Sequence, residues 1–563
     1  MGTAARGTRD RSVYRPRIPG VNAIGAGVHF PETGHGPYRL LRGLHAAAVR
    51  DLARACADPR GAQEARLSAV LAEVSDTAQG RALGLRREWS LDAYRDTVPV
   101  RTHADLLPLL DRVAAGEAGV LTRSPVRMLL ETSGTTGRPK WLPVTDAWAR
   151  SVGAAQSLWV LGMLRDDEAL AQGSALSIVS AAEHARSSGG LPIGANTGRM
   201  FLAQPWYVRL RAPVPYAVYC LEDPEIRAYG ILRHALAQPV RSWSTANPST
   251  ILLYCRRMVA WWDDLAQDCA DGTFRRGPAA ALPDSARRRL GRVGGWGGFP
   301  RTRLPAEPLP ARAWSLRRVS CWTGGSAPFF LEKLATALGA EVPVREAGVN
   351  ASEGAFGVSV DDLGPIAWLS GHVLEFIDAG GRARWAWELE EGAEYRLVVS
   401  TEAGLLRYDM GDLVRVVGWA GGAPRIVFVR KAGNFLNATG EKVTEDQIVA
   451  AARAVAPRAV GVSVSLGWGE RPWFRLAVEM DDAPSDLANR FDVALRAGNL
   501  EYASKRDTDR LAAPVVHVVP PGTFTAWKLA RVRAGAPDAQ VKDPIVLESP
   551  RWDALVAGGD SPS

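Results

Sequence analysis

Cysteine and histidine are both scarce in this sequence. The cysteines are odd in number and far apart, and no two of them form a C-x-x-C pair: Cys56, Cys220, Cys255, Cys269 and Cys321. This spacing argues against a disulfide framework and a structural zinc site, and it fits a cytoplasmic protein. The 8 histidines show no metal-ligand spacing, and although His184 and His372 fall near segments of interest, we assign neither a catalytic role.

The chain also lacks any run of about twenty apolar residues, so we expect no membrane-spanning helix. Its first residues, MGTAARGTRDRSVYRPR, are charged and contain no apolar core, which argues against a secretory signal. Lys and Arg outnumber Asp and Glu by 68 to 60, but no long basic block is present. Scattered arginines therefore indicate a solvated basic surface and give no sign of nucleic-acid binding.

What the chain has is enough apolar sequence for more than one core. It contains 563 residues, 47% of them hydrophobic, and single cores rarely grow that large. Residues 1–37 are rich in Gly, Pro and Arg, so we expect a flexible N-terminus. Residues 38–430 read as a large α/β domain with several sheets. Beyond Lys431 the pattern becomes helix, strand, strand, helix, strand, which predicts a small α+β domain over 431–563.

The segment LETSGTTGRPKWLPVT (130–145) combines glycines, hydroxyls and a lysine between an apolar strand and a helix that Thr145 can cap. Glycine lets backbone N–H groups point at an anion, while hydroxyls and Lys140 add donors and charge. The spacing is not that of a Walker loop. An ordinary surface turn is the alternative, but a strand–loop–helix connection is a usual ligand site. The candidate phosphate-binding residues are Thr132, Ser133, Gly134, Thr135, Thr136, Gly137 and Lys140.

The pattern T-S-G-T-T-G-x-P-K closely resembles the phosphate loop of adenylate-forming enzymes, which activate a carboxylate with ATP. That resemblance implies an acidic residue for Mg²⁺ and an aspartate for the ribose hydroxyls. NASEGAFG (350–357) supplies Glu353 on a Gly-flanked turn, and LRYDMGDLVRV (406–416) supplies Asp412 before a strand. Each alone reads as a solvated turn residue; together and in this order they favour a nucleotide site.

Most of the chain resembles the Gretchen Hagen (auxin-responsive) acyl acid amido synthetases, especially their bacterial members. The matching text is VPVRTHADLLPLLDRVAAGE, SGGLPIG, DGTF, ASEG, EAGLLRYDMGDLVRV, GEKVTE, NLEYASKR, PGTF and QVKDP. The resemblance implies a large adenylation domain with a small mobile C-terminal cap. It also implies a ligase that uses ATP and Mg²⁺ to join a carboxylic acid to an amine, with amino acids as the expected amine.

The resemblance assigns further residues. Ser352 and Glu353 would lie beside the nucleotide and Mg²⁺, Asp412 would hold the ribose and Arg430 would sit at the hinge. Lys542 would reach the site when the cap closes, with Lys528 as a rival. The family usually has an aromatic adenine platform where this chain has Val349, which costs roughly 1–3 kcal/mol of stacking unless something replaces it. A different base, or a nearby Trp or Phe, stays open.

Two other functions fit part of this pattern. An acyl–coenzyme A ligase shares the phosphate loop, but such ligases usually end with P-x-T-x-x-G-K, and this chain has GTFTAWKLARVRAG instead. A catalytically silent nucleotide-binding protein would explain Val349 but not the retention of Lys140, Glu353 and Asp412. The acyl pocket is the least defined part, and SSGGLPIG and SCWTGGSAPFF (320–330) are its candidate walls.

Overall fold

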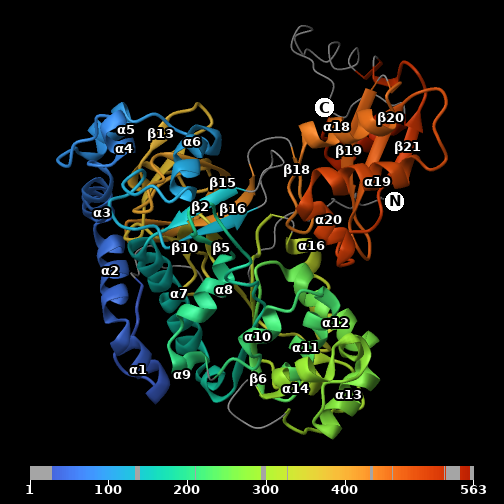
Figure 1. The fold of residues 1–563 in the computed structure, drawn as a ribbon. Helices are drawn as coiled ribbons and strands as arrows, with labels where there is room; N and C mark the ends of the chain where they lie inside the picture. Colours follow the sequence, from blue (N-terminus) through green and yellow to red (C-terminus); the bar gives the residue numbers. More distant parts are fainter. Residues whose placement is uncertain are drawn as a thin grey trace, which may run out of the picture. The chain divides into compact units, whose positions relative to one another are not determined.

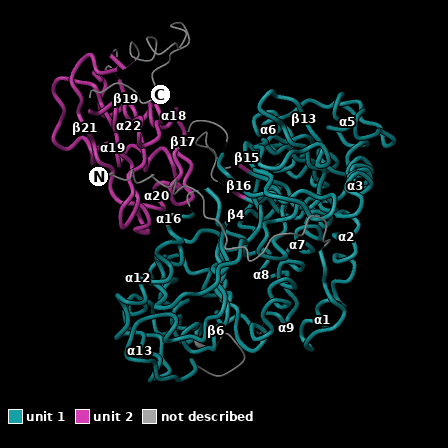
Figure 2. The backbone as a smooth tube through the Cα atoms, turned by 180° about the vertical axis from the view of Figure 1, so that it is seen from behind, with its two compact units in different colours: residues 1–130, 141–431 teal, residues 131–140, 432–563 magenta. Residues whose placement is uncertain are grey.

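The computed structural model describes residues 28–132, 140–209, 211–292, 299–325, 327–431, 435–459, 461–524, 526–527 and 545–557. The chain divides into two compact units, residues 1–130 with 141–431 and residues 131–140 with 432–563 (Figure 2). The C-terminal boundary between the two units lies between Lys431 and Ala432. The grouping of residues 131–140 with the C-terminal residues follows from no pattern in the sequence.

Helices α1 (Gly36–Leu44), α2 (Ala46–Ala57) and α3 (Pro59–Val74) open the first unit. Asp58 caps α3 by accepting from Gly61 N at 2.9 Å, and Pro59 supplies a preset first-turn φ. Upstream of α1, Phe30 is buried and its carbonyl accepts from Arg42 Nε at 3.0 Å. Phe30, which lies within the expected flexible segment, is therefore fixed to this helix.

A four-stranded sheet has the order β2-β1-β5-β4, and its strand β2 leads into helix α7 (Figure 1). Its strands are β1 (Met128–Thr132), β2 (Lys140–Val144), β4 (Ala185–Arg186) and β5 (Pro192–Gly194). β1 and β5 run parallel, with Leu130 opposite Gly194. Thr145 caps α7 (Asp146–Asp166), as the sequence predicts, by accepting from Trp148 N at 3.3 Å. Helix α8 (Asn196–Ala203) follows β5.

A second, all-parallel sheet has the order β3-β6-β7-β8. Its strands are β3 (Ser174–Ser177), β6 (Val240–Ser244), β7 (Arg318–Cys321) and β8 (Val344–Glu346). The helices that pack with it include α11 (Pro224–Ala235), α12 (Pro248–Ala260), α13 (Trp262–Asp271) and α17 (Leu334–Leu338). Trp243 is fully buried between the edges of Tyr254 and Trp314, so part of the high tryptophan content fills this core.

An eight-stranded sheet of order β13-β12-β14-β15-β16-β11-β10-β9 completes the first unit. Its strands are β9 (Val349–Ala351), β10 (Gly354–Val358), β11 (Ile366–Ala367), β12 (Val373–Ile377), β13 (Ala383–Arg384), β14 (Glu394–Ser400), β15 (Tyr408–Ala420) and β16 (Ala423–Lys431). Alternate residues of β15 are buried, which is the pattern of a strand with one face on the core. Neighbouring strands are antiparallel throughout.

The second unit contains the predicted helix-strand-strand-helix-strand series. The elements are α18 (Glu445–Val455), β19 (Gly461–Gly467), β20 (Trp473–Glu479), α19 (Leu487–Gly498) and β21 (Val515–Val519). Helix α20 (Leu500–Asp507) lies between α19 and β21 and was not predicted. The α/β and α+β fold class is confirmed. Among the described residues, no helix is long and apolar enough to cross a membrane.

Candidate active site

Ser352 and Glu353 form the two-residue turn between β9 and β10. Ala351 and Gly354 pair directly across this hairpin. The indole Nε1 of Trp148, in the first turn of α7, donates to the Glu353 carbonyl at 2.7 Å. A side chain at Gly354 would meet His372 Nε2 at 2.6 Å, so glycine is needed where the turn approaches this histidine. The turn that carries the predicted Mg²⁺ ligand is therefore held from two sides.

Tyr408, the first residue of β15, links Glu353 to the acidic end of that strand. Its buried hydroxyl donates to the Glu353 carboxylate. Burial raises the pKa of Tyr408, and the negative charges of Glu353, Asp409 and Asp412 raise it further. Glu353 thus accepts from a hydroxyl of the strand that also carries Asp412. Tyr408 itself was not singled out from the sequence, although it lies in the same LRYDMGD motif.

Asp412 is paired across the sheet with Lys431. The two residues are direct partners on β15 and β16, and Lys431 Nζ lies 2.5 Å from Asp412 Oδ1. Lys431 Nζ also donates to the Met410 carbonyl at 2.8 Å. The ammonium group thus holds the Asp412 carboxylate in place at the end of β15 and β16. Lys431 was overlooked because its partner is distant in sequence and is defined by strand register.

The chain just before Tyr408 is fixed by Arg407. This residue has a left-handed backbone, with φ of 44°. Its guanidinium makes a bidentate pair with the buried Glu375, at 2.9 and 2.8 Å, and donates to the carbonyls of Arg95 and Val98. Such saturation explains how an arginine can be buried and how an uncommon φ is maintained. It sets the starting point of β15, and with it Tyr408 and Asp412.

The loop after β7, from Trp322 to Gly325, is held by the half-buried Glu346. Its carboxylate accepts from Thr323 N at 2.7 Å, from the Thr323 hydroxyl and from Gly348 N at 3.1 Å. Burial raises the pKa of Glu346 despite these hydrogen bonds. A Cβ at Gly324 would lie 2.2 Å from the Phe428 carbonyl, so the loop runs close to β16. Trp322 is 38% exposed at the carboxyl end of β7.

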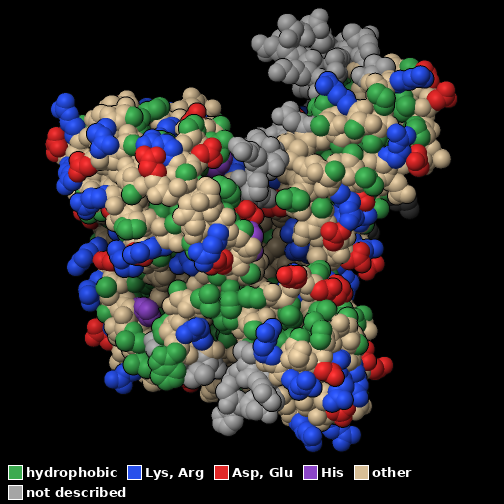
Figure 3. All heavy atoms as spheres, in the orientation of Figure 1, with side chains coloured by type: hydrophobic (Ala, Val, Ile, Leu, Met, Phe, Trp, Pro, Cys, Tyr) green, Lys and Arg blue, Asp and Glu red, His purple; other side chains and the backbone are tan. Residues whose placement is uncertain are grey.

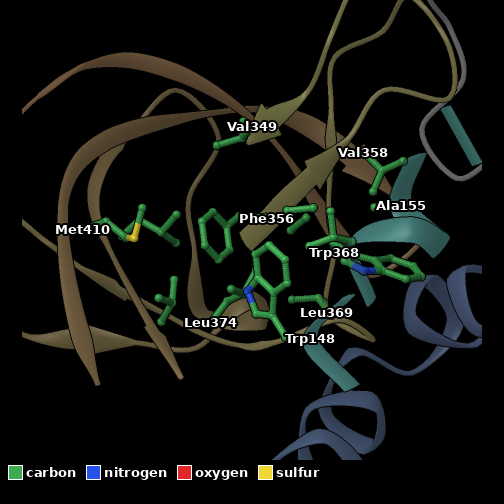
Figure 4. Packing of buried hydrophobic residues seen from close by; sticks show 14 of the residues in the cluster. Trp148, Ala155, Val349, Phe356, Val358, Trp368, Leu369, Leu374 and Met410 are labelled. Atoms are coloured by element: carbon green, nitrogen blue, oxygen red, sulfur yellow. The ribbon is translucent and has the colours of Figure 1, made fainter. Parts of the chain in front are cut away.

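Val349 lies in the hydrophobic core. It is 7% exposed and packs against Gly357 on the neighbouring strand. Figure 4 shows it among the buried apolar side chains around Phe356, with Trp148 and Met410. Its strand neighbour Asn350 points the other way, is exposed and donates to the Ala347 carbonyl. Trp322 and the half-buried Phe428 are aromatic residues at the adjacent loop and strand.

The remaining predicted residues are distributed as follows. Thr132 ends β1, and the half-buried Lys140 begins β2. Arg430 is exposed on β16, opposite Leu413 and next to the boundary between the units. Ser133, Gly134, Thr135, Thr136, Gly137, Lys528 and Lys542 lie outside the described residues.

A metal at Glu353 would need ligands beyond those that the described residues provide. No group of three or more His, Cys, Asp or Glu side chains suited to a metal ion occurs among the described residues. Mg²⁺ commonly takes one or two carboxylates and completes its shell with phosphate oxygens and water. The hairpin carboxylate, oriented by Tyr408, fits that mode of binding. On the face shown in Figure 3, basic and acidic side chains are interspersed.

Curated relatives of the chain are amido synthetases. It is 26% identical over 539 residues to the jasmonoyl–L-amino acid synthetase JAR6 of Nicotiana attenuata, covering 86% of this chain and 90% of the relative. It is also 26% identical over 471 residues to a probable indole-3-acetic acid-amido synthetase of Oryza sativa subsp. japonica, covering 72% of this chain and 74% of the relative.

Solved structures show the same fold. The GH3.15 acyl acid amido synthetase matches with a TM-score of 0.60 and 18% identity, covering 92% of this chain and 96% of that one. A 2-hydroxyisobutyryl-CoA ligase matches with a TM-score of 0.50 and 17% identity, covering 87% of this chain and 90% of that one. The large α/β domain with a C-terminal α+β domain is therefore common to both kinds of ligase.

Three domain profiles cover most of the sequence. They are the GH3 family N-terminal domain over residues 48–344, the central domain over 367–431 and the C-terminal domain over 458–551. The central profile ends at Lys431, the residue at which the first unit also ends. The resemblance inferred from the sequence motifs is confirmed: the chain belongs to the GH3 family.

Proposed function

We propose that this protein is an ATP-dependent amide synthetase, which adenylates a carboxylic acid and transfers the acyl group to the amine of an amino acid. The observation that carries this proposal is the hydrogen bond from Tyr408 to Glu353, which joins the predicted Mg²⁺ ligand to the strand that also carries Asp412. These residues belong to a chain whose curated relatives are named as synthetases that form amides with amino acids.

Each part of the nucleotide has a proposed partner. Asp412 accepts from the ribose hydroxyls, a task suited to a carboxylate with several lone pairs. Segment 133–137 and Lys140 bind the phosphates through amides, hydroxyls and charge. Glu353 holds Mg²⁺, which when bound neutralises charge on the phosphate oxygens. Trp322 and Phe428 are available as aromatic surfaces for the base in place of Val349.

The first step joins the acid to the nucleotide. An oxygen of the substrate carboxylate attacks the α-phosphorus, a new P–O bond forms and the bond to the β-phosphate oxygen breaks, releasing pyrophosphate. In the second step the amine nitrogen attacks the acyl carbon, the C–O bond to AMP breaks and the nitrogen loses a proton. Positioning of the reactants and electrostatic stabilisation supply the acceleration, and no protein nucleophile is needed.

The C-terminal residues are proposed to act as a mobile cap. Arg430 lies where the cap would turn, and Lys542 is the residue proposed to reach the reacting phosphate, with Lys528 as its rival. Closure excludes water, which would otherwise hydrolyse the mixed anhydride.

Acid-dependent exchange of pyrophosphate into ATP, across a library of carboxylic acids, tests the first step without knowledge of the amine. We expect exchange with a subset of acids and none without acid. Mass spectrometry of reactions with amino acids or coenzyme A then identifies an amide or a thioester. A thioester alone would favour an acyl–coenzyme A ligase, and no exchange with any acid would favour a silent nucleotide-binding protein.

A further inference from the structure

Arg199 lies near the Glu353 turn and has no part in the chemistry described so far. It is in α8, directly after β5, and β5 runs parallel to β1 with their residues in register. Ligands of α/β sheets bind beyond the carboxyl ends of the parallel strands. The guanidinium carbon lies 5.2 Å from the ring centre of Trp148, whose indole donates to the Glu353 carbonyl. Arg199 is therefore one side chain removed from that turn.

The guanidinium group of Arg199 is poorly satisfied for a half-buried arginine. Its Nε and Nη2 both donate to one amide oxygen, Asn196 Oδ1, at 3.0 and 2.9 Å. Among the described residues it has no carboxylate partner. The buried arginines 345, 407 and 425 each pair with a carboxylate. The buried Arg101 and Arg233 donate to backbone carbonyls instead, whereas the guanidinium of Arg199 donates to a single side-chain oxygen. Arg199 thus keeps a positive charge, in a partly desolvated place, that no described protein group neutralises.

A planar guanidinium presents paired donors that match a carboxylate. We infer that Arg199 binds a carboxylate of a substrate, and that this carboxylate is one that does not react. The reacting carboxylate loses its charge when it becomes a mixed anhydride, so a salt bridge to it would stabilise the ground state and slow the reaction. A non-reacting carboxylate keeps its charge through both steps.

Two substrates can carry that group, and the inference rests on the proposed function in either case. One is the amino acid, whose α-carboxylate survives in the amide product. The other is the acid, if it is a dicarboxylate. Both substrates present the same chemistry to Arg199. In each case a planar carboxylate would lie beside the face of Trp148. The two sources differ in the step at which Arg199 is needed, because only the acid takes part in adenylation.

The test compares Arg199→Met with Arg186→Met in the full-length protein. Arg186 is an exposed arginine of β4 that pairs with Glu183 at 2.8 Å, so its loss controls for a general change in charge. Pyrophosphate exchange is measured without amine, using acids that carry one or two carboxylates. Amide formation is measured with an amino acid and with the amine that lacks its carboxylate.

We expect Arg199→Met to raise KM about ten- to hundredfold for the substrate that bears the non-reacting carboxylate, the range of a charge-assisted hydrogen bond. The matched substrate without that group should be unaffected, as should Arg186→Met with either substrate. An effect in exchange assigns the acid, and an effect only in amide formation assigns the amino acid. Arg199→Lys, which keeps the charge but loses the planar fork, should recover part of the affinity.

Equal losses with both members of each substrate pair, or no loss with any substrate, would overturn the assignment while the wild type remains active. Absence of exchange in the wild type would instead overturn the proposed function and this inference with it. The partial recovery in Arg199→Lys distinguishes anion binding from a structural role in supporting Trp148.

Discussion

At the scale of single residues, the Tyr408 hydroxyl joins Glu353 to the strand that carries Asp412. It donates to Glu353, so Tyr408→Phe removes a donor that orients the proposed Mg²⁺ ligand while preserving the buried ring. Because the loss of one such hydrogen bond costs about 1–2 kcal/mol, we expect kcat/KM for pyrophosphate exchange to fall about tenfold. The Mg²⁺ concentration giving half-maximal exchange should rise. An unchanged Mg²⁺ requirement would argue that Glu353 does not hold the metal.

His234 makes stability depend on pH at a place remote from this site. Burial, reinforced by the charge of Arg233, lowers the pKa of His234 to about 3. An unfolded histidine has a pKa of about 6.5, so below that pH the unfolded chain binds a proton that the folded chain does not. The stability is therefore complete above about pH 6.5 and is lost as pH falls toward 3, by about 2 kcal/mol between pH 7 and pH 5.

Urea unfolding of the wild type and His234→Gln at pH 7 and pH 5 measures this contribution. The glutamine variant has no proton to gain in this range, so its stability should fall by about 2 kcal/mol less than that of the wild type. The same decline in both proteins would mean that His234 is not held neutral by the fold.

Motif spacing singled out Glu353 and Asp412, whose roles in metal and ribose binding stay predictions, but it did not single out the residues that contact them. Glu353 and Asp412 were predicted because each lies in a short glycine-containing motif. Lys431 and Trp148 could not be found in that way, because strand register and the packing of α7 bring them to the site from distant positions. In the sequence they appear only as a lysine at the end of a strand and a tryptophan in a helix, and neither pattern indicates a functional site. Phosphate binding by Thr132, Lys140 and the residues between them stays a prediction.

At the scale of elements, α7 depends on one glycine for its approach to the sheet. A Cβ at Gly162 would lie 2.2 Å from the Val360 carbonyl, whereas a Cβ at Gly153 in the same helix would meet no heavy atom within 4 Å. Alanine normally stabilises a helix by up to about 1 kcal/mol relative to glycine, and we expect that gain for Gly153→Ala. Gly162→Ala should instead destabilise the protein by about 1–3 kcal/mol through overpacking.

The free energies of unfolding of these two variants provide a matched comparison on one helix. Gly162→Ala should also lower the rate of pyrophosphate exchange, because α7 carries the Trp148 that contacts the Glu353 turn. Equal stabilities for the two variants would show that α7 can shift away from Val360 without cost.

Periodicity and capping predicted individual elements well. The predicted strand before the glycine-rich loop is β1, and the predicted helix after it is α7 with Thr145 as its cap. Helix α20 was not predicted because it has only eight residues, which is too short for a clear helical periodicity, and it directly follows α19. The strand order of the eight-stranded sheet could not be predicted from the sequence either. In this sheet β11 lies between β10 and β16, although β16 is distant from both in the sequence.

At the scale of the whole molecule, the proposed chemistry draws on residues of both units. Glu353, Tyr408 and Asp412 belong to the first unit, whereas residues 131–140 and the C-terminal lysines belong to the second. The change in the predicted order of helices and strands after Lys431 indicated where the C-terminal residues of the second unit begin. It gave no sign that residues 131–140 group with them.

The two candidate lysines of the C-terminal cap can be separated by substitution. A cation that reaches the α-phosphate stabilises charge that develops in the transition state, and loss of such a group costs about 10²–10³ in rate. We therefore expect Lys542→Ala to lower the kcat for pyrophosphate exchange by about that factor, with little change in the KM for ATP. Lys528→Ala, the matched control, should stay within about threefold of the wild type. A large loss in Lys528→Ala with none in Lys542→Ala would reverse the assignment, because each variant removes the same charge from the same unit.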